Sequence, residues 1–211
     1  MTNKKTSSAG LGAPARSAHS PAPSPSADLG LLSIIPLLEK REKARDEVIT
    51  ASRPLVRHCA LAIKILHAGE VEEAKKELGM LEREMKALPP SNASFEYLFE
   101  PIWQEMVEAK LLLAAVERKA LPSYSALGVP PSVYLLGVCD AVGEFRRAML
   151  ESLRVGKKED AQYYFELMDA IYDQLSVIRF SGSLLPNFKP KQDMARHSLE
   201  QARSEILRAK D

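Results

Sequence analysis

The sequence predicts an all-α protein, a bundle of about six or seven helices. Apolar residues recur at helical spacing from Leu29 to the C-terminal end, and no segment shows the alternating pattern of a β-strand. Proline and glycine residues interrupt this pattern at intervals that suit helix ends. The chain has 211 residues, 45% of them hydrophobic, which is enough to build one helical core.

The first predicted helix covers residues 31–52, and Pro54 is expected to kink it or to begin a new helix that ends at His67. Gly69 then serves as a C-cap. The next helix covers residues 70–88, and its apolar face consists of Val71, Ala74, Leu78, Leu81 and Met85.

Four further segments complete the predicted bundle. Residues 95–119 form a long helical pattern that is apolar nearly all round, and a loop rich in proline follows it. The helix over residues 132–154 has a clear apolar stripe and ends at Gly156. The last two helices cover residues 160–180 and 191–209, with proline and glycine between them.

Residues 1–28 differ in composition from the rest of the chain. Serine, alanine, proline and glycine dominate this segment, which contains only three basic residues and one acidic residue. It cannot bury enough apolar surface to offset the entropy of ordering, so we expect a disordered Ser/Ala/Pro-rich tail and one helical domain over residues 29–211. The whole chain carries a net charge of only +1, so a nucleic-acid surface would have to be a local patch.

Composition excludes several classes of protein. The longest apolar runs are only a few residues, so no membrane span is expected, and the N-terminal segment lacks the apolar core of a secretory signal. Cys59 and Cys139 are far apart and form no CxxC pair. Structural zinc and disulfides are therefore not expected, and we expect a cytoplasmic protein.

Two pairs of carboxylates stand out on the predicted helices. Glu105 and Glu108 are three residues apart and share one face of an otherwise apolar helix, where unpaired charges are costly. Asp140 and Glu144 are four residues apart on another helix, with Arg147 on the same face. The second pair also fits an ordinary solvated face with an i,i+3 salt bridge.

If these two helices are neighbours, four carboxylates converge. Oxygen ligands suit Mg²⁺, with Mn²⁺ as a second candidate, and the lack of a Glu-x-x-His motif argues against a di-iron site. A Mg²⁺ cluster of this kind serves phosphoryl chemistry. Gly137 and Gly143 lie near the acidic pair, and a glycine inside a helix suggests close approach of another backbone or a ligand.

A basic stripe lies upstream, because Arg53, Arg57, Lys64 and His67 follow one another at helical spacing. These side chains would suit a surface that follows the phosphates of a nucleic acid strand. The alternative is a solvated face whose charges pair with the nearby acids Glu70, Glu72 and Glu73.

Four segments of the chain resemble translin and translin-associated factor X. They are Arg41-Glu42-Lys43 with Lys64-Ile65-Leu66-His67 downstream, residues 104–109 (QEMVEA), residues 134–147 (YLLGVCDAVGEFRR) and residues 187–207. The third segment is the most specific, and the resemblance runs in order from Leu29 to the C-terminus.

The resemblance implies a helical bundle that assembles into a closed hollow oligomer, often an octamer. Translin binds single-stranded nucleic acid, whereas the factor X branch is a Mg²⁺-dependent endoribonuclease. By resemblance, Glu105, Glu108 and Asp140 are metal and catalytic ligands, and Glu144 is a fourth. The basic helix matches the nucleic-acid-binding region more loosely, and Pro54 departs from the family pattern there.

Three hypotheses follow. The first is a homo-oligomeric endoribonuclease that acts on single-stranded or processed RNA, with carboxylate-bound Mg²⁺ activating water. The second is a non-catalytic shell that binds single-stranded RNA or single-stranded DNA. The third is an all-α nucleotide pyrophosphatase, because such enzymes also bind Mg²⁺ through helices with a Glu-x-x-Glu motif and a second acidic pair.

Overall fold

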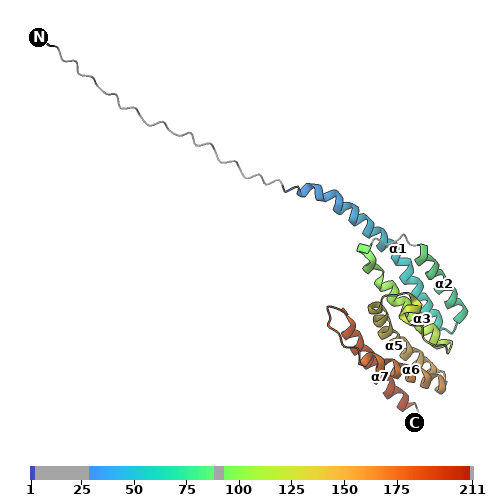
Figure 1. The fold of residues 1–211 in the computed structure, drawn as a ribbon. Helices are drawn as coiled ribbons and strands as arrows, with labels where there is room; N and C mark the ends of the chain where they lie inside the picture. Colours follow the sequence, from blue (N-terminus) through green and yellow to red (C-terminus); the bar gives the residue numbers. More distant parts are fainter. Residues whose placement is uncertain (3–28, 88–92, 210–211) are drawn as a thin grey trace. The chain divides into compact units, whose positions relative to one another are not determined.

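The computed structural model describes residues 1–2, 29–87 and 93–209, and every regular element in those ranges is helical (Figure 1). The all-α prediction is therefore confirmed. The chain divides into two compact units, Met1–Glu39 and Lys40–Asp211. Most of the predicted disordered tail lies outside the described residues. No helix in the described part has the length and apolar character needed to cross a membrane.

The first unit ends in a run of exposed apolar side chains. It contains the 3-10 helix η1 (Leu31–Ile34) and the first residues of α1 (Ile35–His67). The exposed side chains are Leu29, Leu31, Leu32, Ile34, Ile35, Leu37 and Leu38. None of the residues of η1 is buried.

Helix α1 continues through Pro54, so of the two expected outcomes, a kink or a new helix, the new helix is wrong. A proline inside a helix removes one backbone hydrogen bond and costs roughly 3 kcal/mol. The residues that follow offset this cost, because Leu55, Ile63 and Leu66 are buried in the core. Each such side chain contributes about 1.5–3 kcal/mol on burial.

Helix α2 (Val71–Ala87) matches its prediction closely. It follows a tight turn in which Gly69 has φ +82°, the left-handed conformation that favours glycine. The amide of Gly69 donates to Leu66 and that of Glu70 to Ile65, which is the Schellman arrangement. The predicted face of α2 is directed inward, with Ala74, Leu78 and Leu81 buried and Val71 and Met85 partly buried.

Helix α3 (Glu100–Val116) is shorter than the predicted segment 95–119. The 3-10 helix η2 (Ala93–Phe99) precedes it, and Pro101 lies in its first turn, where proline is tolerated. The loop after α3 contains the short helix α4 (Tyr124–Leu127), which periodicity did not reveal. The hydroxyl of Tyr134 donates to the carbonyl of Pro122 at 2.8 Å and fastens this loop.

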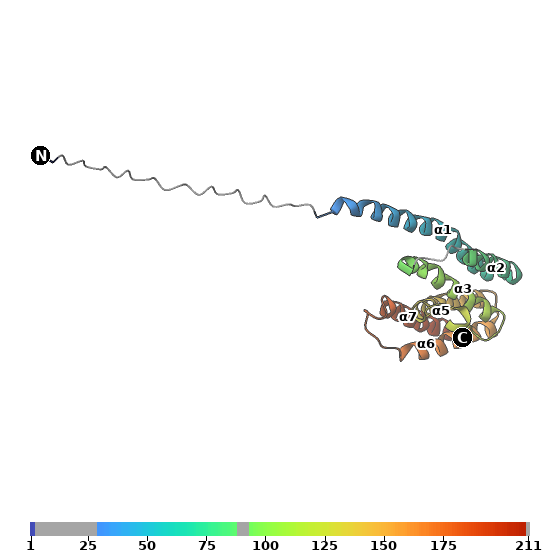
Figure 2. The same ribbon diagram turned by 45° about the horizontal axis from the view of Figure 1, so that its top comes forward.

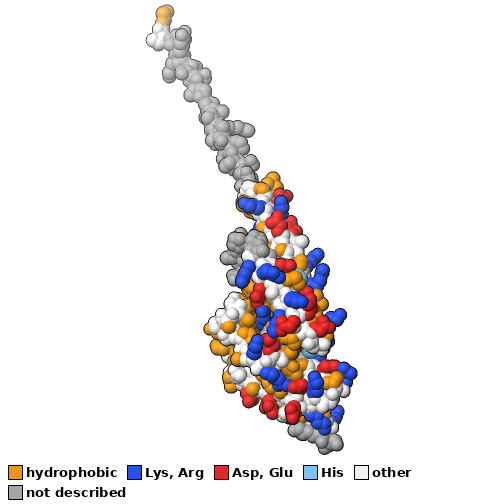
Figure 3. All heavy atoms as spheres, turned by 90° about the vertical axis from the view of Figure 1, so that its right-hand side faces the viewer, with side chains coloured by type: hydrophobic (Ala, Val, Ile, Leu, Met, Phe, Trp, Pro, Cys, Tyr) orange, Lys and Arg blue, Asp and Glu red, His pale blue; other side chains and the backbone are white. Residues whose placement is uncertain are grey.

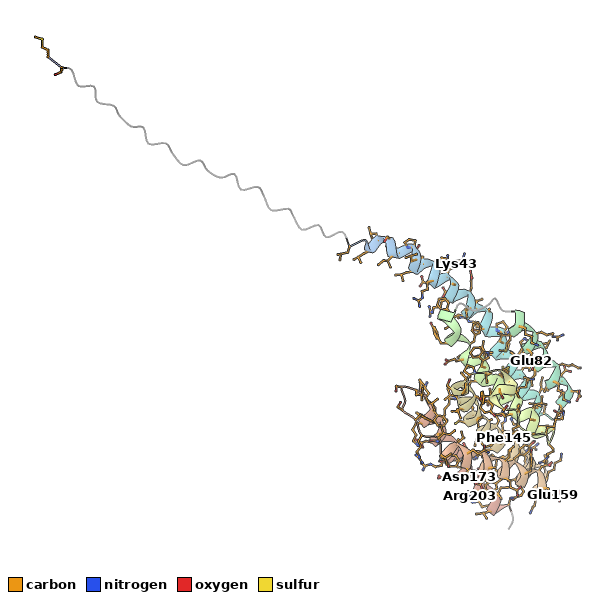
Figure 4. The ribbon with its side chains drawn as sticks, viewed as in Figure 1. Lys43, Glu82, Phe145, Glu159, Asp173 and Arg203 are labelled. Carbon is orange, nitrogen blue, oxygen red and sulfur yellow. The ribbon has the colours of Figure 1, made fainter. Side chains whose placement is uncertain are left out.

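Helices α5 (Pro131–Arg154), α6 (Lys158–Ser176) and α7 (Phe188–Arg208) complete the bundle. Helix α5 packs against α3, α6 and α7, as the two ribbon views show (Figures 1 and 2). Its buried face includes Val142, Phe145 and Met149, and Phe145 lies within the bundle (Figure 4). Because α5 is central, residues on its remaining sides can meet side chains from several other helices.

Candidate functional site

Helices α3 and α5 approach each other closely at Gly137. A Cβ atom at this position would lie 2.7 Å from Val107 Cβ and 2.8 Å from the backbone oxygen of Gln104. The expectation of close backbone approach is therefore confirmed for Gly137. It is not confirmed for Gly143, where a Cβ atom would meet nothing within 4 Å. The contact at Gly137 brings the Glu105 and Asp140 segments together.

Asp140 joins three helices. The Nε2 amide of Gln104 on α3 donates to Asp140 Oδ2 at 2.7 Å. The Nζ of Lys191 on α7 lies 2.5 Å from each oxygen of the same carboxylate. The Asp140 and Lys191 side chains are about three-quarters buried, so the carboxylate is held in one position by an amide and an ammonium group.

Glu144 lies one turn further along α5 and contacts α1. His67 Nε2 forms a hydrogen bond with Glu144 Oε2, and Arg147 Nη1 lies 3.7 Å from the same oxygen. The hydrogen bond from His67 holds the pKa of Glu144 below its usual range. The salt bridge between Glu144 and Arg147 that the spacing suggested is present, and it coexists with the His67 contact.

Glu105 and Glu108 are partly buried, and neither forms a hydrogen bond or ion pair within the described ranges. Burial raises the pKa of Glu105, and the charge of Asp140 adds to the effect. Burial, together with the charges of Glu105, Asp140 and Glu144, raises the pKa of Glu108 to about 8. We call Glu105, Glu108, Asp140 and Glu144 the acidic cluster, because their charges act on one another.

The acidic cluster contains the oxygen ligands that Mg²⁺ or Mn²⁺ prefers. Its present geometry is not that of a finished metal site, because no three His, Cys, Asp or Glu side chains of the described chain converge as ligands. Lys191 instead forms an ion pair with Asp140, and His67 forms a hydrogen bond with Glu144. The donor chemistry therefore fits a divalent cation, and binding would require these side chains to turn.

The predicted basic stripe divides into two parts. Arg53, Arg57 and Lys64 are exposed, and none forms an ion pair with a carboxylate in the described part of the chain. The alternative pairing is not found, since Glu72 and Glu73 contact Lys75 and Lys76. On the face drawn in Figure 3, basic and acidic side chains are interspersed over the helical bundle.

His67 departs from the predicted stripe. Only 9% of its side chain is exposed, and it points to Glu144 rather than to solvent. Its ring is therefore part of the acidic cluster's surroundings. Its position at the last residue of α1, one turn after Lys64, explains why the spacing placed it with the basic residues.

Gln104 and Lys191 contact the acidic cluster but were not among the predicted site residues. Gln104 lies in the segment that resembles the family, although no role was assigned to its amide. Lys191 is 51 residues from Asp140. No spacing in the sequence indicates that pairing, because it depends on how α7 packs against α5.

No family model matches this chain. A crystal structure of AfC3PO does match, with 32% identity and a TM-score of 0.76 over 86% of this chain and 97% of that chain. The chain belongs to the translin/C3PO family. A structure of an AfC3PO–duplex RNA complex matches with the same identity and coverage and a TM-score of 0.74.

Two further proteins are similar to this chain. Apo-NeC3PO is 22% identical over 88% of this chain and 99% of its own, with a TM-score of 0.73, which shows a shared fold. The uncharacterized protein MJ0175 of Methanocaldococcus jannaschii is 30% identical over 180 residues, 82% of this chain and 80% of that protein. The resemblance to the translin family is thus confirmed, whereas the roles of the individual site residues stay predictions.

Proposed function

We propose that this translin/C3PO family protein is a Mg²⁺-dependent endoribonuclease that cleaves single-stranded RNA at the acidic cluster. The observation that carries this proposal is the convergence of four carboxylates from α3 and α5 beside the close helix contact at Gly137. Burial, together with the charges of the other three, raises the pKa of Glu108 to about 8. An excess of buried negative charge of this kind favours a bound cation.

Glu105, Glu108, Asp140 and Glu144 would hold Mg²⁺, or Mn²⁺ in its place. The metal would supply an activated water and stabilise charge on the phosphate. The remaining contacts position these ligands. Gln104 and Lys191 hold the Asp140 carboxylate from two sides, and His67 orients Glu144.

RNA binding is supported by two observations. The exposed side chains of Arg53, Arg57 and Lys64 lie along one helix without carboxylate partners among the described residues. The related protein AfC3PO forms a complex with duplex RNA. Because that ligand is a duplex, the preference of this chain for single strands needs a direct comparison of the two RNA forms.

We also propose that the protein is a homo-oligomer, and the family resemblance favours an octamer. The exposed apolar side chains of residues 29–38 support self-association, since a concentration of exposed leucine and isoleucine marks an interaction surface. Leu32 has 81% of its surface exposed and Leu37 has 68%.

The proposal is tested with an internally cleavable, end-labelled RNA, in single-stranded and duplex form, in Mg²⁺, in Mn²⁺ and in EDTA. The variants are Asp140→Asn and Glu108→Gln, and the matched control is Asp169→Asn, a more exposed carboxylate on α6 that pairs with Arg203. We expect internal cleavage that requires metal, is lost in both site variants and persists in the control. Equal cleavage by wild type and both site variants would refute the assignment.

A non-catalytic RNA- or DNA-binding protein is the second candidate. The ion pair of Lys191 with Asp140 and the hydrogen bond of His67 with Glu144 favour it, because they provide two of the four carboxylates with partners without a metal. This candidate predicts tight, salt-sensitive binding of single-stranded RNA or DNA and no cleavage in any metal. Hydrolysis of a free nucleoside triphosphate in the same assay would instead favour the pyrophosphatase alternative.

A further inference from the structure

A cavity lined by basic side chains lies beside the acidic cluster. It has a volume of about 430 Å³ and lies between the end of α1 and the last turns of α5. Its lining residues are Lys64, His67, Ala68, Arg147, Leu150, Glu151 and Arg154. We call it the basic pocket. Its volume falls within the range of about 300–1,000 Å³ that is typical of small-ligand sites.

The charges of the basic pocket are not balanced by its own acids. Lys64 has no ion-pair partner in the described part of the chain. Arg154 forms two contacts with Glu151, from Nε at 2.8 Å and from Nη2 at 2.5 Å. Arg147 is 58% exposed and reaches only 3.7 Å from Glu144. Three cationic side chains therefore face one lining carboxylate, which favours an anion.

The basic pocket and the acidic cluster share a wall. His67 lines the pocket and forms a hydrogen bond with Glu144 of the cluster. Arg147 also lines the pocket and approaches the same carboxylate oxygen. An anion held by Lys64 and Arg147 would therefore lie next to Glu144, one of the carboxylates that would hold the metal in the proposed function.

We infer that the basic pocket binds a phosphate group of RNA that neighbours the phosphate at the acidic cluster. This inference rests on the proposed function. It adds a site that determines which phosphate of the RNA strand lies at the acidic cluster. The guanidinium of Arg147 can donate two parallel hydrogen bonds to a phosphate, and Lys64 adds a point charge. Arg147 and Arg154 thus become RNA-positioning residues, in addition to the stripe on α1.

The test measures binding apart from cleavage. Fluorescence anisotropy of a short labelled oligouridylate is recorded in EDTA over a series of salt concentrations, for wild type, Lys64→Gln, Arg147→Gln, Arg147→Lys and Arg154→Gln. The matched control is Arg196→Gln, because Arg196 is 56% exposed and forms a similarly weak contact of 3.9 Å with Glu200 on α7. Melting temperatures verify that each variant is folded.

Each pocket variant that loses a charge should bind RNA about fivefold more weakly at 0.1 M salt. The slope of the logarithm of the binding constant against the logarithm of the salt concentration should be smaller in magnitude by about 0.7, the value for one phosphate contact with a single strand. Arg147→Lys should keep the slope, and the control should match wild type. Oligomers with a 5′-phosphate or a 5′-hydroxyl distinguish the source of the anion. A larger wild-type affinity for the 5′-phosphate form, lost in Arg147→Gln, assigns the pocket to a terminal phosphate, and equal affinities assign it to a backbone phosphate.

The inference fails if the pocket variants bind like wild type, or if Arg196→Gln loses as much affinity as they do. RNA binding itself would stand in both cases. If wild type binds with the expected pattern but cleaves nothing in Mg²⁺, the pocket is supported and the nuclease is not. A wild type that binds neither RNA form would overturn both proposals.

Discussion

The ammonium nitrogen of Lys191 lies 2.5 Å from both carboxylate oxygens of Asp140. The two residues belong to α7 and α5, and both side chains are largely buried. The same ammonium lowers the pKa of Glu105 and Glu108, against the effect of their burial. Lys191 is therefore the protein's own counter-ion for the acidic cluster.

Replacing Lys191 with glutamine should destabilise the protein in EDTA, because Asp140 would then face the other carboxylates without a cation. We expect a loss of about 1–3 kcal/mol in the free energy of unfolding and a partial recovery when Mg²⁺ is added. Urea unfolding with and without Mg²⁺ measures both effects. Lys189→Gln is the control, since Lys189 lies on the same helix and contacts Asp193 and Gln192 rather than the acidic cluster. Equal losses in the two variants would contradict a special role for Lys191.

Alanine at Gly137 and at Gly143 should have opposite effects. The new Cβ atom at Gly137 would overlap Val107 and the Gln104 backbone, so we expect a loss of about 1–3 kcal/mol. At Gly143 the Cβ atom meets open space, and the higher helix propensity of alanine should add about 1 kcal/mol. Thermal unfolding of both variants checks the pair, and a stabilised Gly137→Ala would disprove the close helix contact.

The raised pKa of Glu108 makes stability depend on pH. The pKa of Glu108 is about 8 in the folded protein and 4.5 in the unfolded chain. Between pH 4.5 and 8, the folded protein therefore keeps a proton on Glu108 that the unfolded chain has released. The contribution of this proton to the free energy of unfolding is fully present below pH 4.5. It is lost as the pH rises towards 8, at up to about 1.4 kcal/mol per pH unit.

Glu108→Gln should remove this dependence, since glutamine stays neutral. In EDTA, we expect the variant to be similar to wild type near pH 5 and more stable than wild type near pH 8. Chemical unfolding at both pH values measures the difference. A variant that is less stable than wild type at pH 8 would show that the Glu108 carboxylate is not destabilised by its surroundings.

The exposed apolar segment predicts the behaviour of the oligomer. Leu37→Asp places a charge in the run of exposed leucines without disturbing a buried contact, because 68% of the Leu37 surface is exposed. We expect a smaller particle by light scattering after size exclusion, with unchanged helicity by circular dichroism. Leu207→Asp is the control at a similarly exposed leucine, 59% exposed near the end of α7. An unchanged mass for Leu37→Asp would remove this segment from the interface.

Local patterns in the sequence predicted most of the helices because each helix must bury one face. The stripe of α2 and the stripe of α5 with Phe145 and Met149 are buried as expected. Predictions failed where local and tertiary preferences compete. The helix α1 passes through Pro54 because buried residues follow it, and η2 replaces the first turn expected of α3.

The sequence by itself determined the all-α class, the resemblance to the translin family and the faces on which the four carboxylates lie, because helical spacing and short motifs are local properties. Only the tertiary structure decided the partners of those carboxylates. Asp140 meets Gln104 and Lys191 at separations of 36 and 51 residues, and Glu144 meets His67 at 77. These pairings depend on the packing of α5 against its neighbours, since a separation along the chain does not determine which side chains meet in space.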